Sequence, residues 1–143
     1  SKAEIELCKL VNAKNKAIDM SGKLNIGETM KLVKDAKILV CNDSAPAHIA
    51  SMLNIPVVEI FGPTAPRFGF YPINSNSFAI RNQELSCSPC KIHGSNKCPI
   101  GTHECMKSIR AKEISDIVIG KINNETVECK IIEKVDYLDE LFA

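Results

Sequence analysis

The stretch Ile38-Leu39-Val40-Cys41-Asn42-Asp43-Ser44-Ala45-Pro46-Ala47-His48 decides the fold class. It opens with an unbroken apolar run, which predicts a strand buried on both faces, as in a parallel sheet. The polar residues that follow predict a turn. A short helix is expected from Pro46 to Leu53, because proline has no N–H and suits the first helical positions. A buried strand, a turn and a helix in this order are typical of a βαβ unit.

The flanking chain continues this alternation of strands and helices. Apolar residues at helical spacing predict helices, and β-branched runs bounded by glycine or proline predict strands. Helices are expected at about residues 3–13, 27–34 and 113–122, and strands at 17–20, 56–61 and 77–80. The alternation over the first 80 residues predicts an α/β fold with a parallel sheet covered by helices.

The C-terminal stretch, residues 125–143, differs from the rest by being more acidic. Val135, Leu138 and Phe142 lie at helical spacing, which predicts an amphipathic helix. This helix either packs on its own domain or docks on a partner domain. We therefore expect one domain over residues 1–124 and a helical tail over 125–143.

Composition limits the classes of function that remain. With 143 residues, 45% apolar and 24% charged, the chain has the balance of a single soluble domain. The net charge of +1 and the absence of a basic stripe argue against a nucleic-acid partner. The apolar runs are far too short to span a membrane. The chain starts at Ser1 without a signal peptide, so we expect a cytoplasmic protein and a part of a longer one.

The turn at residues 42–48 is the main candidate site. Ligands of open parallel sheets bind beyond the carboxyl ends of the strands, and this turn lies between a strand end and a helix start. Free N–H groups and the positive end of the helix dipole favour an anion there. Ser44 and His48 add hydrogen-bond donors. In the competing interpretation, Asp43 and Ser44 are a plain helix cap and His48 is a surface residue. Neither a Gly-x-Gly-x-x-Gly motif nor a P-loop is present, which disfavours a dehydrogenase or a P-loop NTPase.

The stretch from Ile38 to Ala50 resembles the nucleotide-binding signature of glycosyltransferase family 9, the heptosyltransferase family of lipopolysaccharide biosynthesis. The family pattern there is Asn-Asp-Ser/Thr-Gly-Pro-x-His. Pro56-Val57-Val58 and Phe61-Gly62-Pro63-Thr64-Ala65-Pro66 look like the second strand of the family and its Phe-Gly-Pro-Thr turn. Residues 87–106 resemble a cysteine-bearing segment found in many members. The resemblance covers about residues 1–123.

The resemblance implies a GT-B fold of two Rossmann-like domains, of which this chain would be the C-terminal, donor-binding one. It also implies an ADP-sugar donor, with ADP-heptose the first choice and other sugars open. By similarity, the donor diphosphate would be held by Asp43, Ser44, the Ala45 backbone and His48. Glu4 fits the acid that holds the ribose, or is a solvated acid at a helix start. The backbone at Leu24 would lie by the adenine, or Leu24 is plain core.

The implied reaction divides between two domains. The catalytic base of the family is a carboxylate of the N-terminal domain, so no catalytic residue is expected in this chain, which would bind donor and not turn over alone. No cofactor is required if the helix dipole and hydrogen-bond donors carry the charge of the leaving diphosphate. The implied partners are the N-terminal acceptor-binding domain and a glycolipid acceptor at the inner membrane, where the full-length protein would associate peripherally.

One residue departs from the family pattern. Ala45 stands where the family has glycine. If this position needs a positive φ, alanine costs roughly 1 kcal/mol. If glycine is there for close approach of a phosphate, the methyl group crowds the donor instead.

The cysteines carry the second candidate site. Seven in number, they fit reduced thiols or a metal site better than paired disulfides. Cys87, Cys90, Cys98 and Cys105 offer four thiolates for a structural zinc ion, with His93 and His103 as alternative ligands. Free or buried thiols are the competing interpretation. The alternative function is accordingly a small metal-stabilised interaction module without a transferase role.

Overall fold

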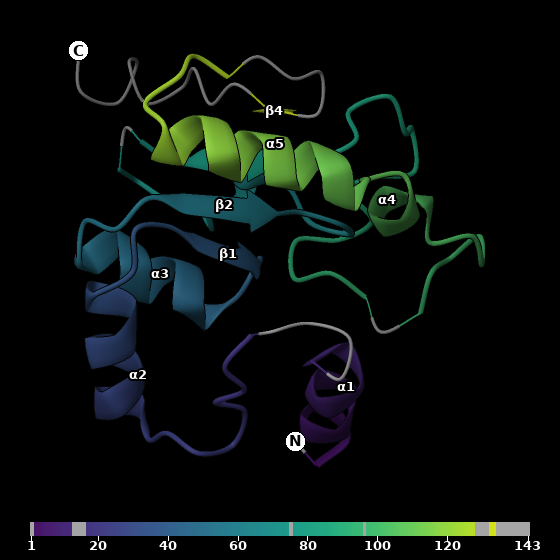
Figure 1. The fold of residues 1–143 in the computed structure, drawn as a ribbon. Coiled ribbons are helices and arrows are strands. Elements are labelled where there is room, and N and C mark those ends of the chain that lie inside the picture. The colour runs from purple at the N-terminus through teal and green to yellow at the C-terminus, as the bar shows by residue number, and fades with distance from the viewer. Residues whose placement is uncertain (1, 13–16, 75, 96, 128–131, 134–143) are drawn as a thin grey trace. The chain divides into compact units, whose positions relative to one another are not determined.

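The computed structural model describes residues 2–12, 17–74, 76–95, 97–127 and 132–133 (Figure 1). The chain forms two compact units, residues 1–32 and residues 33–143. In chain order the elements are α1 (Lys2–Asn12), α2 (Ile26–Lys34), β1 (Leu39–Asn42), α3 (Ala45–Met52), β2 (Val57–Ile60), the 3₁₀ turn η1 (Pro66–Phe68), β3 (Phe78–Ile80), α4 (Glu104–Lys107), α5 (Ala111–Ile122) and β4 (Ile132–Glu133). No helix in these described ranges is long and apolar enough to cross a membrane.

In the first unit, the prediction of a strand at residues 17–20 is wrong. These residues belong to no strand of the described sheet. The side chain of Asp19 instead accepts a hydrogen bond of 2.9 Å from the Ser21 N–H, and the Lys23 N–H donates to the Met20 carbonyl at 3.1 Å. These local bonds turn the chain, and an apolar run this short forms a strand only where another strand pairs with it.

The second unit contains the sheet, whose strand order is β1-β2-β3-β4. β1, β2 and β3 are parallel, and β4 pairs antiparallel with β3. The predicted parallel sheet is thus confirmed, as are the helices of α1, α2, α3 and α5 and the strands of β1, β2 and β3. Each begins and ends within two residues of the expected bounds.

The two faces of the sheet are covered by different helices, as Figure 1 shows for α3 and α5. Val57 of β2 packs with Ala47 and Ala50 of α3 and with Val33 at the end of α2. The next residue, Val58, packs with Ile80 of β3 and Ile117 of α5 on the other face. Side chains of a strand alternate between faces, so this alternation fixes which β2 residues lie under α3.

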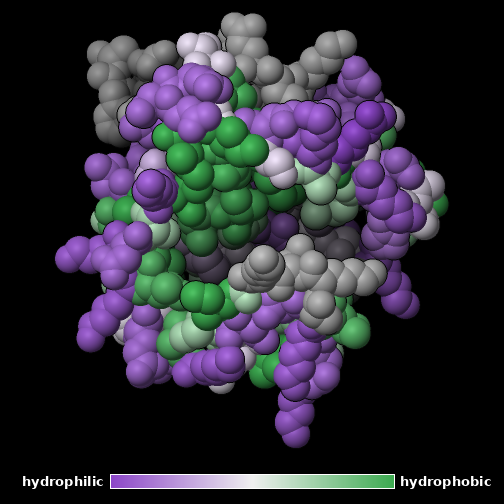
Figure 2. Space-filling view, in the orientation of Figure 1, coloured by the Kyte–Doolittle hydropathy of each residue, from purple (hydrophilic) through white to green (hydrophobic). Residues whose placement is uncertain are grey.

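The prediction that β1 is buried on both faces is wrong. Its residues alternate between half-buried and exposed, and 44% of Val40 is exposed. β1 is the terminal strand of the described sheet, and α5 contacts β2 instead. Exposed apolar side chains are also found on α5, at Ile119 and Ile122. Figure 2 has the orientation of Figure 1 and shows an apolar area on the side of the molecule that is turned to the viewer.

Capping residues set where two helices begin. The Asn25 side chain accepts from the Glu28 N–H at 3.0 Å, while the Glu28 carboxylate accepts from the Asn25 N–H at 2.8 Å, at the start of α2. At the start of α5, the Glu113 carboxylate accepts from the Arg110 N–H at 3.0 Å. Such reciprocal bonds satisfy N–H groups that the first helical turn leaves free.

The predicted C-terminal helix falls mostly outside the described residues. Val135, Leu138 and Phe142, which carry its spacing, are among the residues that the structure does not describe. Residues 132 and 133 within this stretch form β4, a strand that joins the sheet beside β3.

Candidate functional site

The turn between β1 and α3 leaves the helix N-terminus open. Ser44 is the N-cap residue, but its hydroxyl donates to the Asn42 carbonyl at 2.9 Å and makes no capping bond to the helix. Pro46 has no N–H, and the Ala47 N–H bonds to the Ser44 carbonyl at 3.0 Å. Within the described bonds, the N–H of Ala45 is therefore left as a donor at the positive end of α3.

The same turn is held firmly to the sheet. The Asp43 N–H donates to the Ile60 carbonyl at 3.2 Å, which continues the pairing of β1 with β2 by one residue. The turn thus sits at the carboxyl end of β1, the edge at which open parallel sheets bind their ligands.

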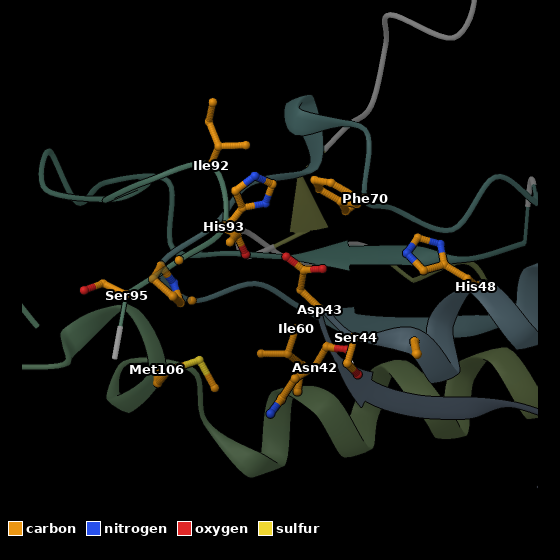
Figure 3. Close-up of a pocket in the computed structure, with 15 residues that line it drawn as sticks. Asn42, Asp43, Ser44, His48, Ile60, Phe70, Ile92, His93, Ser95 and Met106 are labelled. Atoms are coloured by element: carbon orange, nitrogen blue, oxygen red, sulfur yellow. The ribbon is translucent and has the colours of Figure 1, made fainter. Parts of the chain in front are cut away.

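A cavity of about 630 Å³ opens at this edge (Figure 3). Its volume lies in the usual range of small-molecule sites. Most of the lining comes from three parts of the chain: the turn with the start of α3, the end of β2 with the turn after it, and a loop of the cysteine-bearing segment. Phe70 and Met106 complete the lining. The lining residues are Asn42, Asp43, Ser44, Ala45, His48, Ile60, Gly62, Pro63, Thr64, Phe70, Ile92, His93, Gly94, Ser95 and Met106.

All four residues predicted to hold a diphosphate line this one cavity. Figure 3 shows the Asp43 carboxylate directed away from the turn, toward the wall that carries His93 and Phe70. Ala45 is not among the residues with positive φ, so it carries no left-handed strain and the first of its two predicted costs does not arise. Ala45 lines the cavity, and the second predicted cost, crowding of a bound phosphate, stays a prediction.

Three aromatic side chains line the cavity and span it, with Phe70 between His48 of α3 and His93 of the cysteine-bearing segment. The rings of His48 and Phe70 meet edge to face, with centroids 6.4 Å apart. The ring of His93 lies on Phe70 as well, at 6.0 Å. Phe70 therefore stands between two imidazoles that come from distant parts of the chain.

Under the turn lies a buried acid that sequence reasoning missed. Glu59 of β2 is 0% exposed, and neither carboxyl oxygen has a hydrogen-bond partner among the described residues. Burial, and then the charge of Asp43, raise the pKa of Glu59 to about 8, while the nearby Ser44 N–H lowers it by a smaller amount. Glu59 is therefore protonated near neutral pH. The signal in the sequence was a single charged residue inside an otherwise apolar strand.

The neighbouring thiol responds to the same surroundings. Cys41 pairs across from Glu59 in the β1–β2 register. Burial raises the pKa of the Cys41 thiol to about 12, and the charges of Glu59 and Asp43 add to the rise. Cys41 thus stays a neutral thiol at physiological pH and packs as a small apolar residue.

The four clustered cysteines are free thiols. Backbone N–H groups, that of His103 first at 3.4 Å from Sγ, lower the pKa of Cys98. Burial raises the pKa of Cys105, with further contributions from Cys90, Cys98 and Cys87. In the part of the chain that is described, no three His, Cys, Asp or Glu side chains are arranged to hold a metal ion. The zinc site stays a prediction.

The two residues predicted to contact the nucleoside belong to the first unit. Glu4 lies on α1 and is exposed, whereas Leu24 lies in the turn before α2 and is half-buried. In this unit Gly22 lies so near Ile5 of α1 that an added Cβ would be 2.5 Å from Ile5 Cδ1. The turn that carries Leu24 is thus close to α1, and the nucleoside-binding roles stay predictions.

The loop at residues 92–95 is one part of the cavity that sequence reasoning did not find, and Phe70 is another. His93 was considered only as an alternative metal ligand. The signal available in the sequence was the glycine at position 94. In the structure Gly94 has φ +72°, and an added Cβ would lie 3.2 Å from Pro63 Cγ. A glycine in such a loop indicates a sharp turn or a close approach of two segments.

Comparison with known proteins gives consistent matches. Residues 1–100 match the family described as "Glycosyltransferase family 9 (heptosyltransferase)". A lipooligosaccharide heptosyltransferase 2 of Campylobacter jejuni serotype O:6 is 29% identical over 119 residues, which are 79% of this chain and 36% of that protein. The protein of the same name from serotype O:2 is 28% identical over 129 residues, 86% of this chain and 39% of that protein.

A third relative matches over a shorter stretch. The lipooligosaccharide heptosyltransferase 2 of Haemophilus influenzae is 35% identical over 51 residues, 36% of this chain and 15% of that protein. No solved structure matches the chain. The chain spans less than two fifths of the length of the curated relatives it matches. With its three parallel strands flanked by helices, its cavity at the sheet edge and a family match over most of its length, the chain belongs to glycosyltransferase family 9.

Proposed function

We propose that this chain is the donor-binding part of a bacterial glycosyltransferase and that the cavity takes the diphosphate of an ADP-sugar, ADP-heptose first. The observation that carries this proposal is the open N-terminus of α3, whose cap hydroxyl is turned away and which faces a cavity lined by an imidazole. Membership in the transferase family supports it.

The donors around the cavity match a diphosphate. The Ala45 N–H and the dipole of α3 attract an anion, and the His48 ring N–H donates to a phosphate oxygen. The Ser44 hydroxyl can rotate from the Asn42 carbonyl to a phosphate. Asp43 can only accept as a carboxylate, so in this proposal it accepts from a hydroxyl of the donor.

These donors stabilise the charge that develops during transfer. The acceptor hydroxyl attacks the anomeric carbon, the bond from that carbon to the phosphate oxygen breaks, and the diphosphate leaves with the bonding electrons. Donors fixed in place at the leaving oxygens lower the barrier without moving. The base that takes the hydroxyl proton is expected on the N-terminal domain of the longer protein, so this chain alone should bind donor and transfer nothing.

The remaining roles are further parts of the proposal. Glu4 would accept from the ribose hydroxyls, and the backbone at Leu24 would lie by the adenine. The acceptor would be a lipopolysaccharide core or related glycan, reached as a glycolipid at the cytoplasmic side of the inner membrane.

Titration of the chain with ADP tests the proposal. Binding in calorimetry is expected, and His48→Ala should weaken it about tenfold, because a charge-assisted hydrogen bond to phosphate is lost. His103→Asn is the matched control, since this exposed histidine lies outside the cavity and asparagine tolerates its φ of 56°. Absent binding at millimolar ADP, or equal affinities for the wild type and His48→Ala, would contradict the proposal.

A structural zinc ion on Cys87, Cys90, Cys98 and Cys105 is a separate proposal. The lowered pKa of Cys98 favours a thiolate, the form in which cysteine binds metal. Metal analysis decides it. Stoichiometric zinc together with no ADP binding would favour a metal-stabilised interaction module over a donor-binding domain.

A further inference from the structure

The wall of the cavity opposite α3 is built from the cysteine-bearing segment, which the proposed diphosphate site does not use. Ile92, His93, Gly94 and Ser95 line the cavity there. Figure 3 shows His93 beside Phe70 and across the cavity from the Asn42–Ser44 turn. This wall lies some 50 positions along the sequence from the turn it faces.

Buried contacts hold this wall in place. The Ser88 hydroxyl donates to the Gly62 carbonyl at 2.8 Å, and an Arg81 guanidinium N–H donates to the Ser88 carbonyl at 3.3 Å; both bonds are buried. The Cys90 N–H donates to the Pro63 carbonyl at 2.8 Å. The segment is therefore fixed to the turn after β2, and His93 is presented by a built scaffold.

The cavity is larger than a diphosphate needs, and it is lined by groups that the proposed diphosphate site does not use. Its volume of about 630 Å³ is typical of a site for a whole small molecule. The donors for an anion are all on the α3 side. The opposite side offers the imidazole of His93, which can exchange hydrogen bonds with hydroxyl groups, and the flat ring of Phe70, which can pack on C–H groups. The Ser95 hydroxyl on the same side donates to the Lys97 carbonyl at 2.8 Å.

This combination is the chemistry that recognises a sugar. We propose that His93 and Phe70 form the wall that binds the transferred sugar of the donor, so that the cysteine-bearing segment, through His93, determines which sugar is accepted. This proposal rests on the proposed donor-binding function. His93 is the residue that tests it, because its ring meets Phe70 and its side chain faces the cavity.

Calorimetric titration with two probes, ADP and ADP-heptose, separates the sugar wall from the diphosphate site. His93→Ala should weaken ADP-heptose binding about five- to tenfold, the loss of a hydrogen bond with its packing, and leave ADP affinity within about twofold. His48→Ala should weaken both ligands equally. His103→Asn, in the same segment but outside the cavity, should change neither.

The outcomes distinguish this proposal from the one on which it rests. If the wild type binds ADP but His93→Ala leaves ADP-heptose affinity unchanged, or weakens both ligands by the same factor, the sugar wall is refuted while the diphosphate site stands. If the wild type binds neither ligand, the donor-binding function itself fails. Thermal unfolding of each variant shows that the fold is retained.

Discussion

At the scale of single residues, Glu59 is the buried acid beneath the turn at residues 42–48, where the diphosphate is proposed to bind. A fully buried carboxyl without described partners costs too much to ionise, so it keeps its proton. The protonated form also spares Asp43 a second negative charge nearby, which would disfavour a diphosphate. Glu59 thus matters to the site although it lies outside the cavity lining.

Stability should depend on pH through Glu59. The unfolded chain loses this proton near 4.5, the ordinary pKa of a glutamate side chain, whereas the folded protein keeps it until about pH 8. The folded state binds more protons between these values, so the free energy of unfolding should fall as pH rises through this window. Each unit of raised pKa corresponds to about 1.4 kcal/mol.

Urea unfolding of the wild type and of Glu59→Gln measures this effect. The pH is varied from about 4.5 to about 8.5, which covers the interval between the unfolded and folded pKa values. Glutamine keeps the size of the side chain and does not titrate, so the difference between the two curves isolates Glu59. The wild type should lose stability relative to the variant as pH rises. Parallel curves would show that Glu59 ionises normally.

Ala45 shows how a departure from a family pattern can be read once the backbone is known. Glycine at this position suggests either a positive φ or a close approach, and the sequence cannot separate the two. The backbone removes the first, because Ala45 has the ordinary φ of a helix start. The methyl group therefore costs the fold no left-handed strain, and in the proposed site any effect it has would fall on the donor.

At the scale of elements, the cysteine-bearing segment lines the cavity through residues 92–95. Gly94 is one of the points at which this segment contacts the turn after β2, besides Ser88 and Cys90. Its φ is +72°, and an added Cβ would lie 3.2 Å from Pro63 Cγ and 3.6 Å from Thr64 Cγ2. Gly101 of the same segment has φ +73° but nothing within 4 Å of such a Cβ.

These two glycines make a matched pair. Gly101→Ala should cost about 1 kcal/mol of unfolding free energy from the left-handed backbone alone. Gly94→Ala should cost more, because it adds the contact with Pro63, and it should also weaken ADP-heptose binding by displacing His93. Equal losses of stability in chemical denaturation, with unchanged binding, would show that the segment does not rest on this turn.

Elements with strong local patterns were predictable from the sequence. β1 and α3 follow from an apolar run, a polar turn and a proline, and the four residues predicted at the turn do share one cavity. β4 was missed because Ile132–Glu133 is a two-residue strand that exists only through pairing with β3. The wall at His93 was missed for a similar reason, since no local spacing shows which distant turn a loop will contact.

At the scale of the whole molecule, the proposed role of this chain is donor binding, and the proposed catalytic base lies on another domain. It spans less than two fifths of its curated relatives, and its described sheet ends in β1 with Val40 exposed. The residues of the proposed diphosphate site and of its buried support all belong to the second unit, residues 33–143. Donor binding is therefore the property that this chain can be expected to show by itself.

The most direct test of the central claim follows backbone amide signals of the ¹⁵N-labelled chain by NMR during titration with ADP. The account predicts saturable shifts that are largest at Ala45 and His48, where the N-terminus of α3 meets the diphosphate, and little change at Ile117 on the opposite face of the sheet. Saturation with shifts confined to residues outside 42–48, or no shifts at millimolar ADP, would contradict it.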